Sequence, residues 1–180
     1  MAIDIAFFKA KHGQLDDKLI DFFSGRIGYS HCEFVVDPYN TIGSHALTNG
    51  VARFKYNNIY NNPAWDIIRV PEADYKKALE YAEVHIGDSY DFLGVALHYI
   101  GIDIYEERDG QWCSEFCDNC IAASVDRSKW QTSLPMPNEL FVHMLNKLGS
   151  YKVQNLDAGN KPTYAKLPID YLGRIGYGAQ

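Results

Sequence analysis

The sequence predicts an α+β fold in which an antiparallel sheet packs against helices. Strand-like segments follow one another at hairpin spacing through residues 31–70, and helical segments flank them on both sides. With 180 residues, the chain can bury a core without metals or disulfides. We therefore expect one compact domain over residues 1–149, followed by a C-terminal extension over residues 150–180.

Local patterns place the individual elements. Runs rich in β-branched and aromatic residues, bounded by turn-forming residues, predict strands at residues 3–8, 31–36, 42–47, 51–56 and 65–70. Apolar residues that recur every three or four positions predict helices at residues 15–23, 71–86, 92–100 and 137–148. In the first of these helices, the apolar residues of one face are Leu15, Leu19, Ile20 and Phe23.

A further helix is predicted to begin at Cys113. Its apolar and small residues recur at helical spacing without an intervening proline or glycine, at positions Phe116, Cys117, Cys120, Ile121 and Ser124. A cysteine in the first turn of a helix lies at the positive end of the helix dipole. That position lowers the pKa of the thiol and favours the thiolate, which is the nucleophilic form.

A histidine and a carboxylate occur two residues apart in the strand predicted at residues 31–36. Asp37-Pro38 ends this strand as a turn. Because alternate residues of a strand point to the same face, His31 and Glu33 share one face. Glu33 can then accept a hydrogen bond from one imidazole nitrogen while the other nitrogen faces a thiol.

Each of these signals is common by itself. A cysteine at a helix start is more often a small buried residue than a nucleophile, and an alternating His-x-Glu often marks a solvated strand face. Together, however, Cys113, His31 and Glu33 supply a nucleophile, a base and a group that orients the base. The sequence therefore indicates a reaction type, although it does not name the substrate.

The order of motifs resembles the circularly permuted papain-like hydrolases, relatives of the NlpC-type cell-wall peptidases and of the lecithin:retinol acyltransferase group, as found in phages and prophages. The motifs are Ile3-Asp4-Ile5-Ala6-Phe7-Phe8-Lys9, Leu15-Asp16-Asp17-Lys18-Leu19-Ile20, Tyr29-Ser30-His31-Cys32-Glu33-Phe34-Val35, Gly50-Val51-Ala52-Arg53-Phe54, Trp65-Asp66, Tyr90-Asp91-Phe92-Leu93-Gly94, Trp112-Cys113-Ser114-Glu115-Phe116 and Pro137-Asn138-Glu139-Leu140-Phe141. In the permuted branch the histidine strand precedes the nucleophile helix, as it does here. The resemblance covers most of residues 1–148.

This resemblance implies a permuted papain-like fold and a catalytic set in which Cys113 is the nucleophile, His31 the base and Glu33 the third polar group. The acyltransferase branch often places the third group on the next strand, so His45 stays an alternative to Glu33. The implied activity is a cysteine hydrolase of the peptidase or amidase type that cleaves an amide or ester, with peptidoglycan peptide as the first substrate class. A lipid acyltransferase or thioesterase is a further alternative. We expect no cofactor and no metal.

A protein of another class, a structural or adaptor component of a phage virion on a papain-like scaffold, also fits the resemblance. The extension at residues 150–180 is rich in glycine, proline and tyrosine, with little periodicity. A loose tail is the simpler interpretation of such a segment. Its apolar residues instead suit an arm that wraps a neighbouring virion subunit.

Charge and composition exclude several other classes. The formal charge of −6 argues against a nucleic-acid surface. The N-terminus lacks the basic leader and cleavage site of a signal peptide, and no apolar run approaches the roughly twenty residues of a membrane span. We therefore expect a protein that is cytoplasmic where it is made, or packaged in a virion, with four free thiols.

The spacing C-x3-C-x2-C of Cys113, Cys117 and Cys120 matches an iron–sulfur motif. It falls late in the chain and on helical periodicity, whereas such a motif belongs in a loop near the start of a larger barrel. We instead expect Cys117 and Cys120 to fill the buried face behind Cys113. A zinc site from Cys32, Cys117 and Cys120 would lack paired C-x2-C knuckles.

Overall fold

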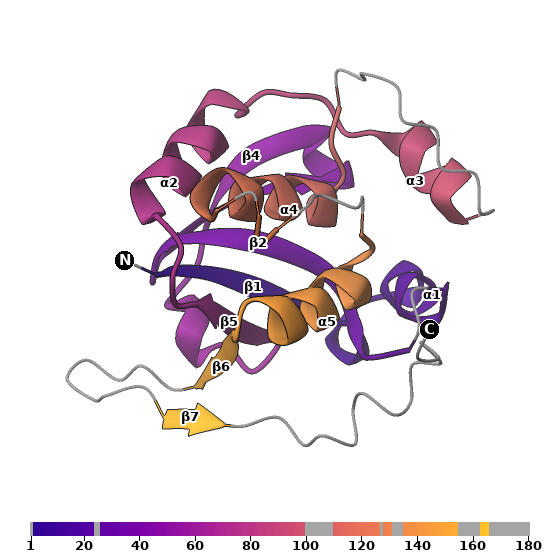
Figure 1. The fold of residues 1–180 in the computed structure, drawn as a ribbon. Helices are drawn as coiled ribbons and strands as arrows, with labels where there is room; N and C mark the ends of the chain where they lie inside the picture. The colour runs from indigo at the N-terminus through magenta and orange to yellow at the C-terminus, as the bar shows by residue number, and fades with distance from the viewer. Residues whose placement is uncertain are drawn as a thin grey trace, which may run out of the picture.

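Seven strands form one antiparallel sheet in the part of the chain that the computed structural model describes, which is residues 2–23, 26–99, 110–126, 128–130, 135–154 and 163–165 (Figure 1). The strands are β1 (Ile3–Lys9), β2 (Tyr29–Asp37), β3 (Asn40–His45), β4 (Gly50–Lys55), β5 (Trp65–Val70), β6 (Tyr151–Gln154) and β7 (Thr163–Ala165). They lie in the order β4-β3-β2-β1-β5-β6-β7. The expected α+β class with an antiparallel sheet is confirmed.

The helices are α1 (Leu15–Phe23), α2 (Tyr75–Val84), α3 (Phe92–Tyr99), α4 (Cys113–Ser124) and α5 (Pro137–Lys147). Short 3-10 turns are η1 (Ala10–His12), η2 (Ala46–Thr48) and η3 (Ile59–Asn61). Helices α2, α4 and α5 pack on one face of the sheet, and α1 and α3 lie apart from each other on the right of the view (Figure 1). None of the described helices is long and apolar enough to cross a bilayer.

The alternation of side chains along the central strands divides the core into two layers. Ile5, Phe7, Cys32 and Phe34 point toward the helices and form the larger core with the helical residues Phe116, Cys117, Cys120, Leu140 and Phe141. The burial expected for Cys117 and Cys120 is confirmed, since both side chains are fully buried. On the other face, Ala6, Val35, Ile59, Trp65, Ile67 and Val153 form a smaller core. His31 and Glu33 therefore belong to the face opposite Cys32 and Phe34.

Two features of the helices differ from the pattern in the sequence. Helix α2 begins at Tyr75, later than expected, because the side chain of Asp74 caps it by accepting hydrogen bonds from the N–H groups of Lys76 and Lys77. In α1, Leu15 and Leu19 are exposed, at 72% and 48% of their surface. The apolar face of α1 is thus only partly buried against the core.

The sheet continues into the segment that was expected to be an extension. Strand β6 pairs with β5, and β7 pairs with β6. Neither strand is indicated by the sequence pattern. Residues 155–162 and 166–180, which make up most of the expected arm, lie outside the described residues, as does residue 100 at the expected end of the third helix.

Candidate active site

The sheet opens between β2 and β3, and the candidate residues line this opening. Toward the start of β2 and the end of β3, the last residue pair between the two strands is Phe34 with Ile42. Strand β3 continues along β4 as far as the pair of His45 with Gly50, and β2 extends back to Tyr29. Beyond that last pair, side chains of the two strands can turn toward one another and toward the helices.

Glu33 is the buried centre of a hydrogen-bond network at this opening. Its Oε1 lies 3.2 Å from Nε2 of His31. The Tyr56 hydroxyl donates to both carboxylate oxygens, at 3.0 and 3.1 Å, and the Thr41 hydroxyl donates to Oε2. Burial raises the pKa of Glu33, but the hydrogen bond with His31, the charge of His31 and the hydrogen bond from Thr41 outweigh burial and hold the pKa below its ordinary value. Glu33 is therefore an anion that orients His31.

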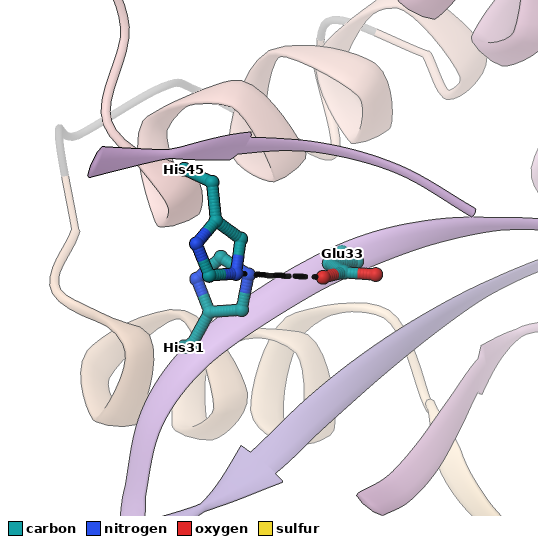
Figure 2. Close-up of side chains that lie close together, drawn as sticks. All are labelled: His31, Glu33 and His45. Atoms are coloured by element: carbon teal, nitrogen blue, oxygen red, sulfur yellow. Dashed lines mark hydrogen bonds and ion pairs between the residues drawn. The ribbon is translucent and has the colours of Figure 1, made fainter. Parts of the chain in front are cut away.

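His45 reaches the same carboxylate from the neighbouring strand. Its Nε2 lies 3.8 Å from Oε1 of Glu33, and its ring lies edge-on to that of His31 with centroids 4.1 Å apart. Both imidazoles turn toward Glu33 in Figure 2. Burial and the charge of His31 lower the pKa of His45. His45 is thus a neutral neighbour of the pair, whereas Glu33 makes the shorter contact with His31.

Gly43 explains how the carboxylate fits between the two strands. A Cβ atom at this position would lie 2.8 Å from Cγ of Glu33, closer than carbon atoms approach in folded proteins. Only glycine therefore leaves space for the Glu33 side chain beneath β3.

The N-terminus of α4 is held against the opening by the segment that precedes it. The Ser44 hydroxyl donates to the carbonyl of Gln111, and the N–H of Gln111 donates to the carbonyl of Ser89 at 3.0 Å. Ser89 in turn bridges to Gly50, whose φ of +143° and close approach to the Asp88 carbonyl require glycine. These contacts fix the position from which α4 begins.

Cys113 is the first residue of α4, and its thiol lines the same cavity as the imidazole of His31. A hydrogen bond from the Cys32 thiol and the charge of His31 stabilise the thiolate more than burial opposes it, so the pKa of Cys113 lies well below its ordinary value. Burial opposes the imidazolium of His31, but Cys113 and Glu33 raise the pKa of His31 to about 10. Burial raises the pKa of Cys32, which remains a thiol donor. The three charged groups therefore form a carboxylate–imidazolium–thiolate chain.

The pH dependence of thiol reactivity tests this chain. Because the pKa of Cys113 is lowered, its thiolate persists as the pH falls, until the pH passes through that lowered pKa. We expect iodoacetamide to alkylate Cys113 nearly as fast at pH 6.5 as at pH 8.5. In His31→Ala the thiol returns toward a pKa of about 8.5, so the rate at pH 6.5 should fall more than about tenfold. Peptide mass spectrometry measures both rates, and a wild-type rate that falls as steeply as that of His31→Ala would contradict the ion pair.

Tyr56→Phe tests whether the buried carboxylate needs its hydrogen-bond donors. We expect the free energy of unfolding to fall by about 1–3 kcal/mol, since a buried charge loses a donor, and turnover to fall several-fold as Glu33 loosens. Urea unfolding and steady-state kinetics measure the two effects. Tyr60→Phe is the matched control, because the Tyr60 hydroxyl donates to Asp4 at 2.6 Å on the same face and away from His31. Equal losses of turnover in both variants would rule out a positioning role for Tyr56.

A cavity of about 270 Å³ opens onto the thiol and the imidazole. Besides Cys113, His31 and His45, its walls come from α1, η2, α3 and the start of α5, through Gln14, Asp17, Ile20, Ala46, Leu47, Tyr90, Val95, Met136 and Pro137. Among the described residues that line the cavity, Asp17 is the one carboxylate and none is a lysine or an arginine. The Asp17 carboxylate accepts hydrogen bonds from the Ser30 hydroxyl at 2.7 Å and from the Gln14 backbone N–H at 2.9 Å.

The structure brings together the three residues predicted from the sequence, Cys113, His31 and Glu33, and it places the alternative His45 beside them. Reasoning from the sequence missed Thr41 and Tyr56. Thr41 had a usable signal, because the turn after Asp37 pairs it with Val35, which shares a face with Glu33. Tyr56 follows the end of β4, and nothing in the local pattern indicates which way its ring turns.

No model of a known protein family matches the chain, and no curated protein matches it.

Proposed function

We propose that the protein is a cysteine hydrolase that cleaves an amide or ester bond, built on a permuted papain-like fold. One observation carries the proposal: the His31 imidazole, 3.2 Å from the buried Glu33 carboxylate, lines the same cavity as the Cys113 thiol. A thiolate at a helix N-terminus that pairs with an oriented imidazolium is the arrangement of thiol hydrolases.

The proposed reaction uses each group in turn. The Cys113 thiolate attacks the carbonyl carbon, and the electron pair of the carbonyl moves onto its oxygen. The His31 imidazolium then gives its proton to the leaving amine or alkoxide, which departs and leaves an acyl thioester on Cys113. Neutral His31 next takes a proton from water, whose oxygen attacks the thioester carbonyl carbon. The C–S bond then breaks, which frees the acid and restores the Cys113 thiolate beside the His31 imidazolium. Glu33 stabilises the imidazolium whenever it forms.

The first turn of α4 supplies donors for the oxyanion. The N–H groups at the start of a helix have no carbonyl four residues earlier to bind, and they point out of the helix end. The N–H of Cys113 belongs to this set, so it can donate to the oxygen on which negative charge develops.

The resemblance in the sequence favours peptidoglycan peptides as the substrate. The cavity is compatible with such a peptide, since Asp17, the one carboxylate among the described lining residues, can meet an amino group.

The surface around the cavity favours a second candidate, an acyl ester or thioester. Leu47, which lines the cavity, is 93% exposed, and Leu15 and Leu19 of α1 and Phe92 and Leu93 of α3 are also exposed. These residues lie on η2, α1 and α3, which contribute to the cavity walls through Leu47, Ile20 and Val95, so we propose that they form an apolar rim near the cavity mouth. An acyl chain would bury this rim, whereas a polar peptide would leave it in water.

Incubation with purified cell wall and with short- and long-chain acyl thioesters tests the proposal and separates the two substrates. Release of peptide fragments supports the first, and hydrolysis that increases with chain length supports the second. If neither class is turned over and a thiol reagent labels Cys113 no faster than Cys117 or Cys120, the hydrolase proposal is wrong.

A further inference from the structure

Three metal-binding groups converge at the opening between β2 and β3. One ligand atom from each of His31, Glu33 and His45 lies within 4.8 Å of the others. Oε1 of Glu33 is 3.2 Å from Nε2 of His31 and 3.8 Å from Nε2 of His45. Figure 2 shows the two imidazoles and the carboxylate facing a common point.

These separations are close to those that a tetrahedral zinc ion imposes on its ligands. Bonds of about 2.0–2.1 Å at tetrahedral angles place ligand atoms about 3.3 Å apart. The two distances to Glu33 bracket that value, and His45 is the group that must move. Its side chain is about one third exposed at the cavity wall, so a small rotation of the ring suffices.

The surroundings leave room for one more ligand. Thr41 and Tyr56 already bind the carboxylate of Glu33 from behind and hold its Oε1 toward the imidazoles, as outer partners of metal ligands do. The ring of Phe54 lies 5.1 Å from that of His45, and the ring of Trp65 lies 6.1 Å from that of His31. The cavity is the open side. Two histidines, one glutamate and a single open position match zinc, whereas an octahedral ion needs three open positions.

We propose that His31, Glu33 and His45 bind one Zn²⁺ ion, with the fourth position open to the cavity. The Nε2 atom of His31 cannot hold the metal and hydrogen-bond to Glu33 at once. The zinc-bound state and the carboxylate–imidazolium–thiolate chain therefore exclude each other. Zinc would act as a reversible inhibitor of the proposed hydrolase, and zinc binding itself does not depend on that activity.

Titration calorimetry of the reduced full chain with zinc chloride tests the proposal. We expect one ion per chain with micromolar or tighter affinity, and a loss of at least about tenfold in affinity for both His45→Gln and Glu33→Gln. His85→Gln is the matched control, because His85 lies at the end of α2, where its Nδ1 is 2.7 Å from the Tyr81 carbonyl oxygen. Its zinc affinity should equal that of the wild type. Urea unfolding verifies that each variant is folded, and His45→Gln alters only a partly exposed side chain.

Several outcomes would overturn the assignment. The wild type could bind no stoichiometric zinc, or His45→Gln could bind it as tightly as the wild type. If Cys113→Ala lost zinc binding as completely as His45→Gln, the ligands of the metal would include the thiolates. Because no substrate is used, a protein without hydrolase activity would still give a clear answer.

Discussion

Cys113→Ser is expected to lower turnover at least about a thousandfold, because a serine hydroxyl is not ionised by a neighbouring imidazole as a thiol is. The chain should stay folded, since serine has nearly the same shape and Cys113 lies at the end of a helix at a cavity wall. Steady-state kinetics, on whichever of cell-wall peptide and acyl thioester the wild type hydrolyses, and urea unfolding measure the two properties. After brief alkylation, the intact mass of Cys113→Ser should lack the adduct that forms rapidly on the wild-type protein.

Cys117→Ala is the matched control for this prediction. Cys117 lies one helical turn after Cys113 and is fully buried in the larger core. It should retain turnover and rapid labelling, with only the stability loss that follows removal of a buried sulfur atom. A Cys113→Ser protein that keeps more than a small fraction of wild-type turnover would exclude Cys113 as the nucleophile.

Glu33→Gln is expected to lower turnover about a hundredfold while the fold is retained. Glutamine keeps the shape of the side chain, and its carbonyl can still accept from Tyr56 or Thr41. It cannot compensate the charge of the His31 imidazolium, so the pKa of His31 should fall from about 10. The descending limb of the pH–rate profile, where His31 loses the proton that it must donate, should then move to lower pH.

His45→Ala separates the two candidates for the third group. If Glu33 orients His31, removal of His45 should change turnover only several-fold, because the contact of 3.2 Å between His31 and Glu33 remains. A mild effect of Glu33→Gln together with a severe effect of His45→Ala would assign the role to the next strand. If all these variants stay active, the groups meet without catalytic purpose.

Local patterns in the sequence were sufficient to predict most of the described elements of the fold, because burial of one strand face imposes a period of two and burial of one helix face a period near 3.6. The five N-terminal strands and all five helices lie close to their predicted positions. The shared face of His31 and Glu33 also followed from the strand alone.

The rest depends on contacts between distant segments. The pattern does not reveal that β2 and β3 part beyond Phe34, yet this opening is what allows a thiol from the helical layer to meet an imidazole of the opposite face. The pairing of Tyr151–Gln154 with β5 is also set by tertiary context rather than by local propensity. The exposure of Leu15 and Leu19 could not be predicted either, since periodicity identifies an apolar face but not what covers it.

The base and the carboxylate come from one hairpin, whereas the thiol arrives on a helix about eighty residues later in the chain. A hairpin forms within about 1–10 µs, but docking of α4 must first close a long loop and build the core around Phe116. Until that step is complete, Cys113 has neither the imidazole nor the Cys32 thiol beside it, and its pKa stays that of an ordinary cysteine. A nascent or partly unfolded chain therefore carries a thiol that reacts slowly at pH 6.5, and rapid labelling of Cys113 at that pH reports only on fully assembled molecules.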